Sequence, residues 1–351
     1  MLSSWEQLIG HDKQRQLLRH CLTQRRLGHA WVFSGPAGIG KRQFARLLAK
    51  SVFCRNQSTE ELHVCGECRA CRGFAVNSWP DFHEVGLLSG RREILISQMA
   101  GEDGKRGREG LCCELSMTPQ NSDRRVAVIN DADRMTTEAA NSLLKTLEEP
   151  PADALILLIT TSPESLLPTI RSRCQQVRFF PLSAAAIGTI LLRESLVDSE
   201  AAAKIVADLC DGSLETARQL LDSELRTLRD LVVRGLDQLD SMDSLTTSKT
   251  VIETIEQMSA DPGEQRQNAQ WLLKFVCDDL RARLRALASG APEDRLTQRL
   301  GARRGIDVLG PMLDRTVRAS EQIDSMVPVS LAVDALFDDL ARILRIGMKR
   351  V

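Results

Sequence analysis

The sequence contains no tyrosine, and aromatic residues make up only 4% of its 351 residues. This scarcity argues against the extended aromatic platforms on which many proteins stack single-stranded nucleic acid. The formal net charge is only -1 at pH 7. Any contact with DNA or RNA would therefore depend on local basic patches, because the protein as a whole has no strong positive field.

Long apolar segments are also missing. The N-terminal stretch MLSSWEQLIGHDKQRQ is polar and lacks the apolar centre of a secretion signal. No run of apolar residues in the sequence is long enough to span a bilayer. These absences predict a cytoplasmic protein that has no membrane partner.

Ten cysteines are present, and four of them form a compact pattern. Cys54, Cys65, Cys68 and Cys71 have the spacing C-x10-C-x2-C-x2-C. In a reducing compartment such a cluster is more typical of a metal site than of disulfide bonds. Four thiolates complete the tetrahedron of a structural zinc ion, so we predict a bound Zn2+. An iron–sulfur cluster and four free thiols are the alternatives.

Alternating strand and helix patterns predict an α/β domain in the first half of the chain. Apolar runs at residues 29–35, 81–88, 126–135 and 154–162 are typical of buried strands. Residues 136–151 contain a helix that begins at a threonine and ends before two prolines. This alternation favours a parallel sheet with crossover helices. The apolar spacing is helical from residue 182 onward, and we predict three domains, 1–181, 182–243 and 244–351.

The segment GPAGIGK, residues 35–41, follows a predicted strand and precedes a predicted helix. In that context it matches the phosphate-binding loop G-x-x-x-x-G-K, in which glycines let backbone N–H groups converge on phosphates. Gly35, Gly38, Gly40 and Lys41 are therefore the candidate nucleotide-binding residues. The next residue is Arg42, where a serine or threonine hydroxyl would normally hold magnesium.

Several further segments together resemble one known family. They are WEQLIGHDKQRQLLRHCLTQRRLGHAWVFSG at residues 5–35, LLKTLEEPP at 143–151, the strand end TTS at 160–162 and SRC at 172–174. With the four-cysteine insertion, they are similar to the bacterial clamp-loader ATPases of the AAA+ superfamily. The resemblance is strong from about residue 5 to about residue 178. It implies a P-loop α/β AAA+ module with a zinc-binding insertion, then an all-α lid and an all-α C-terminal collar.

Four positions depart from what the resemblance implies for an ATP-hydrolysing motor. Arg42 replaces the magnesium hydroxyl, and Asn130 and Asp131 stand where motors carry the Asp-Glu pair that organises magnesium and activates water. Glu215 stands where motors carry an arginine that senses the γ-phosphate, and Arg218 lies one turn later. These departures indicate the non-motor, delta-prime type of the family, with its own ATPase lost and ATP binding weak or absent.

The resemblance also assigns a role to Arg173. In the SRC segment of clamp loaders, the arginine enters the ATP site of the neighbouring subunit, where such an arginine finger stabilises the transferring phosphoryl group. The plainer alternative is a surface arginine at the end of a helix. The implied partners are the gamma/tau and delta subunits in a hetero-oligomeric ring. Through that ring they include the sliding clamp and primed DNA in replication by the DNA polymerase III holoenzyme.

Two other functions have been weighed against this one. An ATP-hydrolysing motor of the gamma/tau type would need a hydroxyl at Arg42 and an acidic pair at Asn130 and Asp131, and the sequence has neither. A zinc-dependent DNA-processing enzyme would need an open metal position with a histidine or carboxylate nearby. Four thiolates instead close the coordination sphere, as in structural zinc sites.

Overall fold

The protein is represented by a computed structural model that describes residues 4–24, 26–56, 62–88, 91–239, 244–290 and 295–349. The chain divides into two compact units, Met1–Arg218 and Gln219–Val351. The boundary between the two units falls inside the predicted domain 182–243, and the three-domain division stays a prediction. Its boundary at 243/244 adjoins residues 240–243, which lie outside the described part of the chain.

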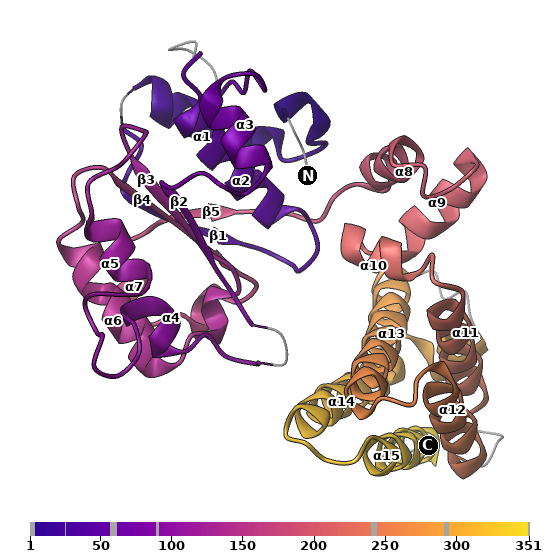
Figure 1. Ribbon diagram of the computed structural model, residues 1–351. Helices are drawn as coiled ribbons and strands as arrows, with labels where there is room; N and C mark the ends of the chain where they lie inside the picture. The colour runs from indigo at the N-terminus through magenta and orange to yellow at the C-terminus, as the bar shows by residue number, and fades with distance from the viewer. Residues whose placement is uncertain are drawn as a thin grey trace. The chain divides into compact units, whose positions relative to one another are not determined.

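A parallel sheet of five strands in the order β2-β3-β4-β1-β5 forms the centre of the first unit. Helices cover both of its faces, with α1 to α3 on one side and α4 to α7 on the other (Figure 1). The strands are β1 (Ala30–Ser34), β2 (Phe82–Val85), β3 (Arg125–Ile129), β4 (Ala154–Thr160) and β5 (Gln175–Arg178). This arrangement confirms the predicted α/β fold class.

The strand sequences explain why both faces are covered. All residues of β1, β3 and β4 are buried, as expected for parallel strands that lie between two helical layers. Side chains alternate between the faces: Trp31 and Phe33 pack with α2, whereas Ala30 and Val32 pack with α6.

The helices that precede the second unit are η1 (Trp5–Gln7), α1 (Asp12–Thr23), α2 (Lys41–Phe53), α3 (Arg69–Ala75), α4 (Ile96–Ala100), α5 (Leu111–Ser116), η2 (Ala132–Arg134), α6 (Thr137–Glu148), η3 (Pro163–Ser165), α7 (Pro168–Arg171), α8 (Ala184–Arg193), α9 (Glu200–Leu209) and α10 (Leu214–Gln219).

Four of the five strands were predicted, and β5 was missed. Its sequence QQVR buries only Val177, so it lacks the apolar run that marks the other strands. It forms because it pairs with β1 at the edge of the sheet, and only the three-dimensional fold supplies that partner. The predicted helix at 136–151 is confirmed as α6, whose N-cap Thr136 accepts a hydrogen bond from the backbone of Ala139.

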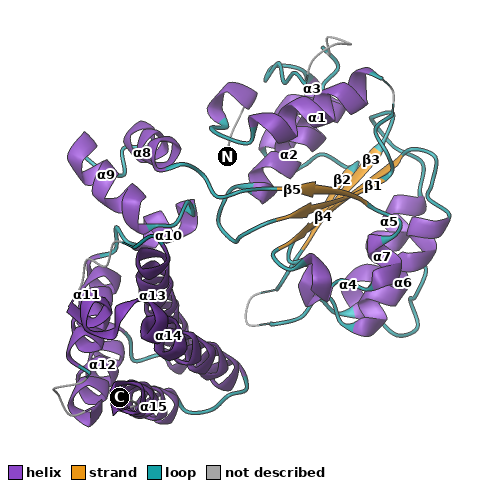
Figure 2. Ribbon diagram, turned by 180° about the vertical axis from the view of Figure 1, so that it is seen from behind, coloured by secondary structure: helices purple, strands orange, loops and turns teal. Residues whose placement is uncertain are grey.

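The second unit is entirely helical among its described residues, as predicted (Figure 2). Helix α13 packs along α14, and both α12 and α14 pack along α15. Helix α14 contains a non-helical residue, Gly301. The helices are α11 (Ser223–Gln238), α12 (Ser244–Met258), α13 (Pro262–Ala288), α14 (Arg295–Asp324) and α15 (Val329–Lys349). Within the described residues, no helix is both long and apolar enough to cross a membrane.

Candidate functional site

The predicted phosphate loop lies between the end of β1 and the start of α2. Gly38 and Gly40 have φ angles of 71° and 97°, a left-handed conformation that glycine adopts without strain. Lys41, the first residue of α2, is only 5% exposed, and its ammonium donates hydrogen bonds of 2.6 Å to the carbonyls of Gly35 and Pro36. The loop therefore has the predicted position in the fold, and the lysine reaches across it.

Burial lowers the pKa of Lys41 to about 8, although the charges of Asp131, Asp133 and Glu215 act to raise it. These acids come from the end of β3 and from the start of α10. The lysine thus lies where the loop, the third strand and the following helical segment meet. In this way the fold brings together Lys41, Asp131 and Glu215, which the sequence analysis had selected from three distant segments.

The segment from Ser213 to Glu215 lies directly on the phosphate loop. The backbone N–H of Leu214 donates a 3.0 Å hydrogen bond to the carbonyl of Gly38. A Cβ atom at Gly38 would lie 2.3 Å from Ser213 Oγ and 2.5 Å from Glu215 Cβ. No side chain other than hydrogen fits between the loop and this segment, and the carboxylate of Glu215 lies beside the glycine.

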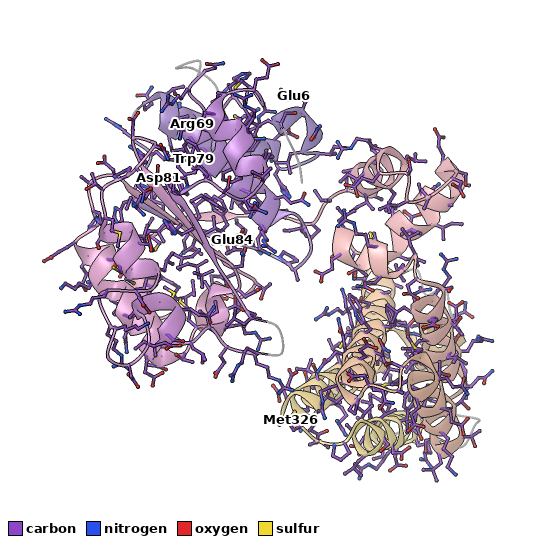
Figure 3. All side chains as sticks on the ribbon, viewed as in Figure 1. Glu6, Arg69, Trp79, Asp81, Glu84 and Met326 are labelled. Carbon is purple, nitrogen blue, oxygen red and sulfur yellow. The ribbon has the colours of Figure 1, made fainter. Side chains whose placement is uncertain are left out.

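Arg42 and Asn130, two of the positions that depart from the motor pattern, meet in a cluster around Glu84, a residue of β2 that is labelled in Figure 3. Arg42 Nε and Asn130 Nδ2 each donate a 2.7 Å hydrogen bond to the same oxygen, Glu84 Oε1. Arg46, one turn further along α2, pairs with the other oxygen. We call Arg42, Arg46, Glu84 and Asn130 the Glu84 cluster.

The carboxylate of Glu84 is paired within the cluster. Burial acts to raise the pKa of Glu84, but hydrogen bonds from Arg42 and Asn130 and the charge of Arg46 hold that pKa below its ordinary value. The carboxylate is therefore ionised and already neutralised by two guanidinium groups. Asn130 Oδ1 is buried and has no hydrogen-bond partner among the described residues, so it is the one neutral oxygen left at this position.

Neither Glu84 nor Arg46 was predicted from the sequence. Little in the sequence marks them, because Glu84 is a charged residue inside a short strand and Arg46 is one of many basic residues on the helices. Arg46 is nevertheless 12% exposed, and its guanidinium stacks over Phe74 and bonds Asn77. It thereby connects the Glu84 cluster to the segment that carries the four cysteines.

A small cavity of about 20 Å3 lies beside the phosphate loop, bounded by residues of the N-terminal segment, the loop and α8, among them Leu8, Gly40 and Ile190. That volume is on the order of what one water molecule needs. Arg193 of α8 closes the same region by donating a 2.7 Å hydrogen bond to the carbonyl of Gln7.

The four predicted cysteine ligands converge on one point. Their sulfur atoms all lie within 4.8 Å of one another, and the Cys65 and Cys71 sulfurs are 3.9 Å apart. A zinc ion with Zn–S bonds of about 2.3 Å requires sulfurs roughly 3.8 Å apart, so the donor set fits a tetrahedral metal such as zinc. Backbone N–H groups of Cys65, Cys68 and Cys71 point at the sulfurs of Cys54, Cys65 and Cys68, each at 3.4 Å, which favours thiolates.

Local structure explains this convergence. Cys54 is the C-cap of α2, Cys68 is the N-cap of α3, and Cys71 lies in the first turn of α3. Gly66 has a φ of 77° and allows the tight turn between Cys65 and Cys68. Arg69, labelled in Figure 3, marks the start of α3. The insertion packs on the rest of the first unit through Phe74.

Arg173 follows the short helix α7 and precedes β5, far from the chain's own phosphate loop in sequence. Its side chain is 35% exposed and forms a 2.8 Å ion pair with Glu148 at the end of α6. A 2.9 Å hydrogen bond to the carbonyl of Thr169 fixes the same guanidinium. Together with a 3.4 Å hydrogen bond to Ser172 Oγ, these contacts orient a partly exposed arginine that still has unused N–H donors.

Comparison with known proteins identifies the family. The profile described as "DNA polymerase III, delta subunit" matches residues 10–183. The DNA polymerase III subunit delta' of Bacillus subtilis is 34% identical over 238 residues, which cover 67% of this chain and 67% of that one. The chain belongs to the DNA polymerase III delta' subunit family. This confirms the resemblance found in the sequence.

The alignments with other relatives cover smaller shares of those relatives' chains. The Pseudomonas aeruginosa subunit delta' is 37% identical over 60% of this chain and 61% of that one. The Bacillus subtilis subunit tau is 31% identical over 65% of this chain but only 39% of its own. The similarity to tau concerns a shared part of the fold, so the choice between motor and non-motor subunit depends on individual residues of the phosphate loop and its surroundings.

Proposed function

We propose that this delta' family member is the non-motor subunit of the DNA polymerase III clamp loader. The observation that carries the proposal is the convergence of Arg42 and Asn130 on Glu84 Oε1. In a motor these two positions would present oxygen ligands to magnesium. Here both present N–H donors to a carboxylate that is already paired. A phosphoryl-transfer site without its metal loses most of its charge stabilisation, so the chain does not hydrolyse ATP.

We also propose that Arg173 acts on the neighbouring subunit as an arginine finger. This role is supported by the partly exposed position of Arg173 and by the contacts with Glu148 and Thr169 that hold its guanidinium. A planar guanidinium can meet two phosphate oxygens at once. The partners in this proposal are the gamma/tau and delta subunits of a hetero-oligomeric ring, and through the ring the sliding clamp and primed DNA. Loading of the clamp is then an activity of the assembly.

A gamma/tau-type motor is the second candidate, since the tau subunit of Bacillus subtilis is a relative. It would require ATP to bind beside Lys41 with its metal. The paired Glu84 cluster and the carboxylate of Glu215 against Gly38 both oppose this. We therefore favour the non-motor subunit.

ATP turnover tests the proposal directly. The isolated chain should release phosphate from ATP and magnesium no faster than a Lys41→Ala variant, because Arg42 and Asn130 present N–H donors to Glu84 where a motor presents oxygen ligands to the metal. The same chain should raise ATP turnover when it is assembled with its cognate gamma/tau subunits. Turnover by the isolated chain at the rate of a motor subunit, abolished by Lys41→Ala, would contradict the proposal.

For the four cysteines we propose a structural zinc ion. Elemental analysis of the purified protein should find about one zinc per chain, and Cys65→Ser should lower this content sharply because three thiolates leave the tetrahedron open. Protease cleavage between Cys54 and Cys71 should become faster in this variant. The sheet should persist, because the α/β core is large enough to fold without the insertion.

Cys113→Ser is the matched control, since Cys113 is a free thiol on α5 outside the cluster. It should leave the zinc content unchanged. A protein without metal whose insertion resists proteolysis as well as before would show that the four thiols have only a packing role. Iron in place of zinc would support the cluster alternative.

A further inference from the structure

We propose that Glu215 is the residue that excludes nucleotide from the phosphate loop, by placing its own carboxylate where the outer phosphates of a nucleotide would lie. The loss of magnesium ligands explains the loss of hydrolysis. It does not by itself explain a loss of binding, because glycine-rich loops bind phosphates through backbone N–H groups and a lysine. A separate feature of the chain must therefore decide whether nucleotide binds.

Glu215 packs closely against the phosphate loop. Glu215 Cβ lies 2.5 Å, and Glu215 Oε2 3.0 Å, from the position of a Cβ atom on Gly38. Ser213 Oγ is even closer to that position, at 2.3 Å. The hydrogen bond from Leu214 N to the Gly38 carbonyl holds this contact in register. Glu215 is itself an exposed residue, so its carboxylate lies at the surface beside the loop, where an entering nucleotide would meet it.

The charge of Glu215 also acts on the loop. A phosphate loop attracts anions, and Lys41 is the cation that would reach the outer phosphates. The negative charge of Glu215 acts to raise the pKa of Lys41, with a smaller effect than the charges of Asp131 and Asp133. A nucleotide that entered the loop would bring its phosphates close to this carboxylate, and the like charges would repel each other. Glu215 thus opposes the usual ligand of the loop.

Contacts made by α8 and α10 hold the segment that carries Glu215 in place. Arg218, one turn further along α10, forms a 2.7 Å ion pair with Glu194 at the end of α8. Arg193, the preceding residue, bonds the Gln7 carbonyl. These contacts fasten the helical segment to the N-terminal segment and to the loop. In a motor, a bound nucleotide would connect the helical segment to the loop. In this chain, protein groups connect the two directly.

Binding of ADP to the isolated full-length chain tests the inference. Titration calorimetry and fluorescently labelled ADP, each without magnesium, should show that Glu215→Gln binds ADP at least tenfold more tightly than the unchanged chain. Glu215→Arg should bind more tightly still, because it replaces repulsion with attraction. Adding Lys41→Ala to either variant should remove the gain. Magnesium should change these affinities little, since Arg42 and Asn130 offer the ion no paired oxygen ligands.

Glu200→Arg is the matched control: it makes the same charge reversal at an exposed position of α9 and should leave ADP binding unchanged. Glu215→Gln nearly preserves side-chain shape, so it tests the idea even if Glu215→Arg does not fold. Folded Glu215 variants that bind ADP no better than the unchanged chain would overturn the inference, as would a gain that survives Lys41→Ala. The inference rests on the proposed non-motor role. The inference is tested by ADP binding to the isolated chain, whereas the arginine finger is tested by ATP turnover of the neighbouring subunit. The two proposals can therefore fail independently.

Discussion

Replacing Arg173 by alanine should slow ATP hydrolysis at the adjoining motor subunit by about a thousandfold or more, the usual worth of an arginine finger. The loss should appear in the neighbour's catalytic rate and in clamp loading on primed DNA. The delta' chain itself should fold normally. Its ion pair with Glu148 is at the surface, and exposed pairs contribute at most about 1 kcal/mol to stability.

The variant complex must be shown to assemble before its rate is interpreted. Arg173→Lys should restore little activity, because an ammonium on a flexible chain does not reproduce the planar fork of donors that meets phosphate oxygens. Arg171→Ala is the matched control, since Arg171 ends α7 two residues earlier and should matter much less. If Arg173→Ala assembles and turns over ATP at the unmutated rate, the residue only caps its helix and the finger proposal is wrong.

Asp81→Ala should lower the free energy of unfolding by about 3 kcal/mol or more, because it removes three hydrogen bonds to a buried, charged carboxylate. Asp81, labelled with Trp79 in Figure 3, immediately precedes β2 and is completely buried. Its carboxylate accepts hydrogen bonds of 2.7 to 2.8 Å from the backbone of Gln120, the backbone of Asn121 and the hydroxyl of Ser122. It thereby anchors the strand that carries Glu84.

The same carboxylate makes a pH prediction. Burial acts to raise the pKa of Asp81, but the hydrogen bonds from residues 120–122 and the charge of Arg125 hold that pKa below its ordinary value. A lowered pKa contributes stability above the unfolded value of about 4, and that stability is lost as the pH falls through the folded value. Asp81→Asn should therefore unfold at a lower urea concentration at pH 7 and show a weaker loss of stability in acid.

Urea unfolding followed by tryptophan fluorescence measures both effects, because Trp5, Trp31 and Trp79 all lie in the first unit. Asp123→Ala is the control, since Asp123 is an exposed acid in the adjacent turn and should change the unfolding midpoint little. An Asp81→Ala protein as stable as the unchanged one would mean that water or a rearranged turn replaces the carboxylate.

The amino-acid sequence was sufficient to predict the fold class and the cluster of four cysteines that could hold a metal, and it placed the glycine-rich loop between a strand and a helix. These features depend on short-range patterns: apolar periodicity, glycine and cysteine spacing, and segments that resemble one family. Such patterns are local because a helix, a tight turn or a metal knuckle is determined mainly by residues within a few positions of each other.

The tertiary structure alone decided how distant residues meet. Arg42 and Asn130 are 88 positions apart in the sequence, yet both bond Glu84 Oε1, because parallel strands end at one edge of the sheet beside the start of α2. Glu215 was a departure from a motif in the sequence, and the fold placed it against Gly38. The polar strand β5 exists because β1 offers it an edge. Hydrogen bonds and charge pairs of this kind depend on distance in space, which a one-dimensional pattern does not contain.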